Sequence, residues 1–280
     1  MQFSFAYPFE FVYFLKFFRH YLLYQIMPEG VITSRKWLID NNLSRHAIDN
    51  LVKSNQLESI SKGIYVRNAT KITWQSVAYS LQSILNTDLI IGGLTSLEMQ
   101  GLSHHLSFSE NKIVHLYEND LIPEWVANLA LNINFVRHTK NNLFGKSLDK
   151  NEIGSNKKKR THSFTIERDW DNSREKLVLS SPERACLEVL LDVPQKVTFE
   201  HADQLMQGLT TLTPRNLQKV LEGCQNVKVK RLFFWFADRN NYVWLSKINR
   251  ECITLGSGNR MIVKAGKLDN KYIITVPEWL

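Results

Sequence analysis

The chain has 280 residues, enough for about two domains with ordinary hydrophobic cores, so a small fold held together by disulfides is excluded. Hydrophobic residues make up 44% and charged residues 22%, a globular composition that excludes a chain disordered or fibrous over its whole length. The 35 lysines and arginines exceed the 27 aspartates and glutamates, and the formal net charge of +8 favours an anionic partner, nucleic acid first and an acidic membrane surface second.

The first 26 residues are rich in aromatic side chains, and we expect an irregular lead-in followed by a helix that ends before Gly30. Charged residues at Glu10, Lys16 and Arg19 interrupt the apolar run before it reaches the ~18 residues that a membrane-spanning helix needs. We expect the aromatic residues to pack against the domain that follows. A helix lying on a membrane surface is the less favoured alternative, because few positive charges accompany the aromatic residues.

A helix-turn-helix is predicted to follow Gly30. Thr33 can cap a short first helix, Asn41 and Asn42 break it, and Ser44 caps a second helix that runs to about residue 54. The apolar residues of this second helix share one side. The opposite side is polar and can form hydrogen bonds with base edges; it carries His46, Asp49, Asn50 and Lys53.

Two short strands are expected next, at residues 57–60 and 64–66, joined by a turn at Gly63. The order of a helix, a helix-turn-helix and a β-hairpin predicts a winged helix-turn-helix domain over residues 1–70.

DNA binding is the function that this predicted domain favours. The start of the second helix would enter the major groove, where Arg45 suits guanine and Asn50 suits adenine, while most of the other polar residues would contact phosphates. A protein-interaction adaptor stays open as an alternative, because every helix has a polar solvent face. The predicted DNA-binding residues are Thr33, Ser34, Arg35, Ser44, Arg45, His46, Asn50, Lys53, Lys62 and Arg67.

The remainder, residues 71–280, is predicted to form a larger α+β domain. We expect an amphipathic helix over 71–90 and an apolar strand at 89–91. Near the end of the chain, residues 262–263 and 272–276 are expected to pair as a small sheet.

Three consecutive helices are expected to form a helical layer in the same domain. Ser180 and Glu183 have the spacing of a capping box, and Pro182 lies where its missing N–H is harmless, so a helix starts there. A second helix is expected over 199–209 and a third from Thr213.

Motifs spread over residues 20–280 carry a family resemblance. They lie at residues 92–106, 180–190, 228–233, 255–260, 266–269 and 272–277. Together with the predicted winged helix, they resemble the AbiEi antitoxins of type IV toxin–antitoxin systems, which act in abortive infection as a defence against phage. The resemblance implies an antitoxin that represses its own operon by binding inverted repeats in the promoter. It also implies a nucleotidyltransferase-like toxin as the functional partner, with or without a stable complex.

No catalytic residues are expected. Gly92, Gly93 and Ser96 have the pattern of a nucleotidyltransferase turn but lack the paired carboxylates that bind its metal ions, and the adjacent His104 and His105 would point apart on a helix. The alternative is an enzyme acting on nucleic acid, a nuclease or phosphotransferase. It would have to use the alternating acids Glu167, Asp169 and Asp171.

A polar stretch at residues 139–162 carries seven positive and two negative charges and is expected to be a loop. A solvated loop and an accessory DNA contact are equally favoured there. The accessory contact would use Lys157, Lys158, Lys159 and Arg160. A second basic cluster, Lys228, Lys230 and Arg231, precedes an apolar helix, and a structural role is as well supported as a ligand-binding one.

The cysteines, Cys186, Cys224 and Cys252, lie far apart and form no C-x-x-C pair. Neither a zinc knuckle nor a disulfide framework can be built from them. We therefore expect a reducing, cytoplasmic setting, with no metal and no cofactor.

Overall fold

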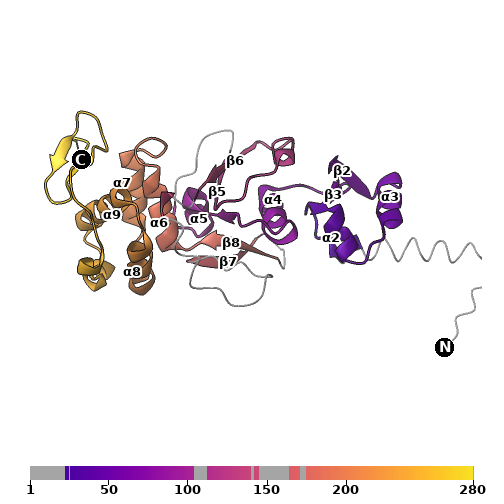
Figure 1. Ribbon diagram of the computed structural model, residues 1–280, viewed down its shortest axis with the longest axis horizontal. Helices are drawn as coiled ribbons and strands as arrows, with labels where there is room; N and C mark the ends of the chain where they lie inside the picture. The colour runs from indigo at the N-terminus through magenta and orange to yellow at the C-terminus, as the bar shows by residue number, and fades with distance from the viewer. Residues whose placement is uncertain are drawn as a thin grey trace, which may run out of the picture. The chain divides into compact units, whose positions relative to one another are not determined.

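A computed structural model describes residues 23–24, 26–103, 112–139, 142–144, 164–170 and 175–279 (Figure 1). The chain divides into two compact units, which are described one at a time. The first comprises residues 1–87, 122–131 and 169–177, and the second comprises the rest. The first unit continues past residue 70, where the sequence placed its first domain boundary.

The first unit contains the two short helices and the β-hairpin expected from the sequence. Its elements are β1 (Thr33–Ser34), α2 (Arg35–Asp40), α3 (Arg45–Lys53), β2 (Leu57–Ser61), β3 (Ile64–Arg67), α4 (Trp74–Tyr79), the π-helix η1 (Ser80–Ile84) and the 3-10 helix η2 (Glu124–Val126). The strands form an antiparallel sheet in the order β1-β3-β2. Gly63 takes the positive φ of +75° that the hairpin turn requires.

Side-chain hydroxyls start both short helices. Ser44 accepts a hydrogen bond from the backbone N–H of Ala47, which confirms the cap predicted for α3. The cap predicted for the first helix was wrong by one residue. Ser34 accepts from the N–H of Trp37, because Thr33 is buried in β1 opposite Tyr65.

An apolar core holds these elements together. Apolar side chains from α2, α3, β2 and β3 meet two residues of the N-terminal segment, Leu23 and Met27. The buried members are Leu23, Met27, Leu38, Leu43, Ala47, Ile48, Leu51, Leu57 and Tyr65. Leu23 and Met27 therefore join the N-terminal segment to this core. The aromatic residues before Leu23, whose packing was predicted, lie outside the described residues.

The helix expected over 71–90 is shorter than predicted. Thr73 caps it through a capping box with Ser76, so α4 begins at Trp74, and the last turn widens into η1. The Ser80 hydroxyl donates to the carbonyl of Ser76 and accepts from the N–H of Ile32. A hydroxyl that competes for a helical carbonyl in this way distorts the regular ladder.

The second unit contains a mixed five-stranded sheet and a helical layer. Its elements are β4 (Ile90–Ile91), α5 (Gly93–Met99), β5 (Lys112–Tyr117), β6 (Ile133–His138), β7 (Thr165–Asp169), β8 (Lys176–Ser180), α6 (Pro182–Leu191), α7 (Phe199–Gly208), α8 (Pro214–Gly223), α9 (Val227–Asn240), η5 (Val243–Lys247), η6 (Arg250–Cys252), β9 (Lys267–Asp269) and β10 (Ile274–Val276). The strand order is β6-β5-β4-β8-β7, with β5 and β6 parallel, β4 and β8 parallel, and β4 and β5 antiparallel.

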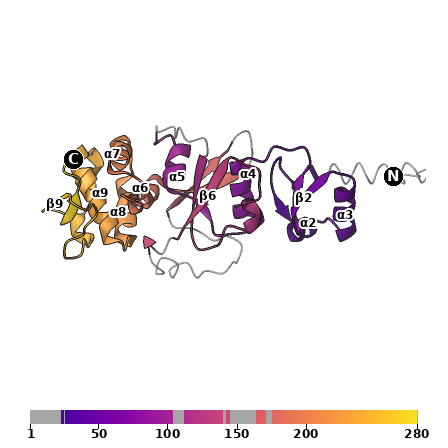
Figure 2. The same cartoon turned by 90° about the horizontal axis from the view of Figure 1, so that it is seen from above.

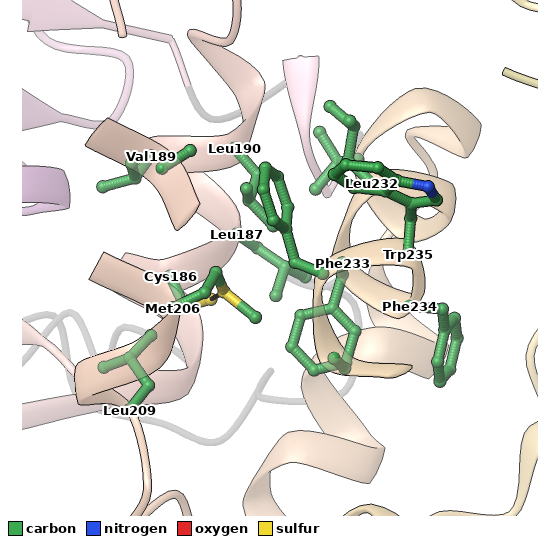
Figure 3. Close-up of a cluster of buried hydrophobic side chains, with 14 of the residues drawn as sticks. Cys186, Leu187, Val189, Leu190, Met206, Leu209, Leu232, Phe233, Phe234 and Trp235 are labelled. Atoms are coloured by element: carbon green, nitrogen blue, oxygen red, sulfur yellow. Dashed lines mark hydrogen bonds between the residues drawn. The ribbon is translucent and has the colours of Figure 1, made fainter. Parts of the chain in front are cut away.

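The predicted helical layer is confirmed, and α9 adds a fourth helix to it. Helices α6 to α9 form one group in both views, and α9 contacts β10 of the β9–β10 hairpin (Figures 1 and 2). Figure 3 shows side chains of α6 and α7, including Leu187, Leu190 and Met206, packed against Leu232 and Phe233 of α9. The helices of the layer therefore share one aromatic and aliphatic core.

Two details of the second unit differ from the sequence predictions. Ser181, not Ser180, caps α6 by accepting from the N–H of Arg184, because Ser180 is buried at the end of β8. The strand that pairs with residues 274–276 is β9, whereas residues 262–263 form no strand.

Among the helices described, none combines the length and the apolar composition needed to cross a membrane. Among the described residues, no group of three or more histidine, cysteine, aspartate or glutamate side chains is placed so that it could hold a metal ion.

Candidate nucleic-acid interface

Helix α3 is amphipathic in the way the sequence predicted. Ala47, Ile48 and Leu51 are buried in the core of the first unit. The exposed residues of the opposite side are Arg45, His46, Asn50 and Lys53. A short helix that packs in the core on one side and is polar on the other is suited to enter a DNA groove.

Asp49 belongs to this face but is not free in solvent. Its Oδ1 atom accepts a hydrogen bond from Nη2 of Arg35 at 2.7 Å, which links the middle of α3 to the start of α2. The Nη2 and Nε atoms of Arg35 also donate to the hydroxyl oxygen of Tyr65, at 2.8 and 3.0 Å. We name these three side chains the Arg35 clamp. The hydrogen bonds to Tyr65 first, and to Asp49 second, raise the pKa of Arg35, so the guanidinium stays charged.

A shallow hollow opens beside the Arg35 clamp. It is lined by Arg35, Lys36 and Ile39 of α2 and by Arg45 of α3. Lys36 is paired with Asp40 at 3.1 Å, and Ile39 is exposed in spite of its apolar side chain. Three cations therefore surround one hollow between the helices. The sequence prediction had not included Lys36 or Ile39, because helical periodicity does not show which residues of two helices face one another.

The remaining predicted contacts divide into exposed and internal residues. Ser44 and Lys62 are exposed, Ser44 at the start of α3 and Lys62 at the hairpin turn. Thr33 is fully buried, so its side chain cannot reach a phosphate; this part of the prediction is corrected. Ser34 is occupied as the cap of α2.

Arg67 has an internal role. Its Nη1 donates to the carbonyl oxygen of Met27 at 3.0 Å, and its guanidinium lies 3.7 Å from the centre of the Tyr24 ring. The side chain therefore ties β3 to the N-terminal segment. The predicted accessory residues, Lys157, Lys158, Lys159 and Arg160, lie outside the described residues.

The glycine and serine motif that suggested a nucleotidyltransferase turn has a structural explanation. A Cβ atom at Gly92 would lie 2.4 Å from Cδ2 of Tyr117, so this glycine permits a close approach of the chain. The N–H of Gly93 donates to Oε2 of Glu188 at 2.8 Å, and the hydroxyl of Ser96 donates to the carbonyl of Ser180 at 2.7 Å. Each group is occupied by the protein itself.

Glu188 continues into a buried ionic network. Arg184 donates to Glu188 at 2.7 Å and to Glu118 at 2.8 Å, and all three side chains are at most 3% exposed. Burial alone would lower the pKa of Arg184, but the two carboxylates outweigh it and raise the pKa. The arginine remains charged and joins α6 to the residue that follows β5.

Two histidines of neighbouring strands lie beside this network. His115 Nδ1 is 2.9 Å from His138 Nε2, and the His138 ring is stacked on Tyr117 with ring centres 4.5 Å apart. Burial is the main cause that lowers the pKa of each histidine to about 4, and the charge of Lys196 adds to it. The pair is therefore uncharged at neutral pH.

The basic cluster that precedes the apolar helix lies inside α9 and serves the fold. Lys228 Nζ donates to the carbonyls of Leu191 and Val193. Arg231 is 1% exposed and donates to the carbonyls of Leu255, Gly258 and Ile273. Neither side chain is available to a ligand.

Of the three acids considered for a nuclease site, the structure describes two. Glu167 and Asp169 are exposed on β7, two residues apart on one strand, and Asp171 lies outside the described residues. His104 and His105 also lie outside the described residues.

The fold and the candidate site together define a mixed α+β protein, with a small unit of short helices and a β-hairpin before a larger α/β unit. The chain belongs to the AbiEi antitoxins, transcriptional regulators of type IV toxin–antitoxin systems. The family model described as "Transcriptional regulator, AbiEi antitoxin, Type IV TA system" matches residues 111–277, and the model of the AbiEi antitoxin N-terminal domain matches residues 19–108. The family resemblance carried by the sequence motifs is thereby confirmed.

A similar solved structure is that of the RV2827C protein from Mycobacterium tuberculosis. It is 13% identical, with a TM-score of 0.48, over 87% of this chain and 85% of that chain. No curated protein matches this chain.

Proposed function

We propose that the chain binds double-stranded DNA through the exposed face of α3 and represses its own promoter. The observation that carries the proposal is the polar face of α3, where Arg45, His46 and Asn50 are exposed, while the opposite side of the helix is buried in the core. The helix-turn-helix and hairpin would form a winged helix, with α3 in the major groove. The operator would consist of inverted repeats, so that two copies of the chain bind together.

Each exposed residue of the face has a distinct chemical role in this proposal. Arg45 would donate two hydrogen bonds to O6 and N7 of guanine, and Asn50 would pair with N6 and N7 of adenine. Lys53 and Lys62 would contact phosphates and add affinity without sequence choice. A phosphate contact by Lys157 and its basic neighbours stays a prediction from the sequence.

The second unit would carry the antitoxin activity and counter a nucleotidyltransferase-like toxin. This part of the proposal rests on the family resemblance, and it assigns no enzymatic step to the chain. All three cysteines are free thiols, and Cys252 is exposed, which fits a reducing cytoplasm.

Arg45→Ala is the direct test. We expect it to weaken binding to the promoter by roughly 1 to 3 kcal/mol and to relax the choice of base at one position, since a paired arginine contributes about that much discrimination. The measurement is a titration of the promoter duplex, and of duplexes substituted at each base pair, at several salt concentrations.

The control is Arg215→Ala, which removes an exposed arginine from the first turn of α8 in the other unit. It should leave promoter affinity unchanged. Equal promoter affinity for Arg45→Ala and the unaltered chain would refute the groove assignment. Binding to the promoter that is absent, or insensitive to salt, would favour an adaptor that holds a protein partner.

A further inference from the structure

Asp49 is the acidic residue of α3, and it lies on a surface that would meet DNA. It lies one helical turn after Arg45 on α3, and its side chain is 46% exposed. A carboxylate is repelled by phosphates, so it lowers affinity for any duplex unless it is neutralised and used. In the Arg35 clamp, the guanidinium of Arg35 neutralises the charge of the Asp49 carboxylate.

The clamp also fixes where the carboxylate lies. The Tyr65 side chain is 5% exposed, and its residue pairs with Thr33 across the sheet. Its hydroxyl holds two nitrogens of Arg35, and Arg35 in turn holds Oδ1 of Asp49. A half-exposed carboxylate is thus connected to a buried anchor through a planar, rigid guanidinium.

We propose that Asp49 contacts a base in the DNA complex, accepting a hydrogen bond from the exocyclic amine of a cytosine, and that Arg35 is its positioning residue. The inference rests on the proposed function, because it assigns a further specificity residue to the same face of α3. An ionised carboxylate only accepts hydrogen bonds.

Cytosine is the base that matches such an acceptor. In the major groove cytosine presents the N4 amine as its donor, whereas adenine places the N7 acceptor beside its amine, and a carboxylate is repelled there. Oδ1 is already held by Arg35, and Oδ2 is left to accept from the base. Arg45, one turn earlier, presents the opposite chemistry and suits guanine.

Asp49→Asn tests the proposal, because it keeps the shape of the side chain and removes its charge. We expect affinity for the promoter duplex to fall about tenfold, the effect of losing one discriminating base contact. We expect affinity for an unrelated duplex of equal length to rise, and its salt slope to steepen by about 0.9, since Arg35 becomes available to a phosphate.

Opposite changes on the two duplexes are the signature of a base contact. The unaltered chain should also lose affinity when one promoter cytosine pair is replaced, and Asp49→Asn should not distinguish that duplex from the promoter. The control is Glu58→Gln, which removes an exposed carboxylate from β2 and should not lower promoter affinity. Affinities that fall together, rise together or stay unchanged on both duplexes in Asp49→Asn would overturn the inference.

Tyr65→Phe provides a second test that leaves every charge in place. It removes the hydroxyl that anchors Arg35, so we expect a smaller loss on the promoter and none on the unrelated duplex. Thermal unfolding of each variant shows whether the domain is folded. An unchanged promoter affinity in a folded Tyr65→Phe would remove Arg35 as the positioning residue. If the unaltered chain binds neither duplex, the proposed function itself fails.

Discussion

Arg184→Met is expected to lower the free energy of unfolding of the second unit by about 3 to 5 kcal/mol. Arg184 neutralises Glu118 and Glu188 inside the protein, and both carboxylates are 1% exposed. Removing one partner of a buried ion pair leaves an uncompensated charge, which costs about that much. Methionine keeps a long apolar side chain in the space, so the loss reports mainly on charge. Urea-induced unfolding measures it.

Lys196→Met is the matched control. Lys196 pairs with Asp192 at 3.7 Å, but its side chain is 57% exposed. The Asp192 side chain is 14% exposed, but water reaches the ammonium group and screens the pair, so we expect a contribution of about 0 to 1 kcal/mol. A loss below about 1 kcal/mol for Arg184→Met as well would show that the network is not a stabilising ionic centre.

The second large effect is a loss of stability on mild acidification. The pKa of His115 and that of His138 are each lowered to about 4 in the folded chain, whereas an exposed histidine has a pKa of about 6.5. Between these values the unfolded chain binds protons that the folded chain does not. Stability therefore falls as the pH drops from about 6.5 to about 4, by about 1.4 kcal/mol per pH unit for each histidine.

His138→Gln separates this effect from the titration of the carboxylates. The unfolding free energy of this variant should vary less steeply with pH over the same window than that of the unaltered chain. The slope should be smaller by at least the contribution of one bound proton. The charged groups facing the pair, Asp192 and Lys196, are retained in this variant. Parallel pH profiles for the two proteins would show that the histidines do not resist protonation.

Local sequence signals predicted the first unit well, and their failures have a common cause. Thr33 and Ser34, like Ser180 and Ser181, are adjacent hydroxyl residues, and either member could cap the helix that follows. In both pairs the first residue is buried within a strand, and the second becomes the cap. Burial of a side chain within a sheet is a tertiary property, so spacing alone selected the wrong member.

Most of the five-stranded sheet was not predicted. Strands β5 and β6 carry polar residues among the apolar ones, such as His115 and His138, that hide the alternation of apolar residues expected of a strand. Val114 and Leu116 do alternate within β5 and could have indicated it. The clamp between Arg35 and Asp49 joins residues 14 positions apart on two helices, and only the packing of α2 on α3 brings them together.

The buried Arg231 limits which sequence changes the C-terminal part of the chain can accept. Its guanidinium is buried and satisfied by the main-chain carbonyls of Leu255, Gly258 and Ile273. Every amino acid offers the same carbonyl, so these contacts place no demand on which side chains occupy those positions. They do require the backbone to keep its path, so that the three carbonyl oxygens stay within hydrogen-bonding distance of Arg231. Between α9 and β10 insertions and deletions should therefore be resisted, because changing the path would leave a buried cation without acceptors.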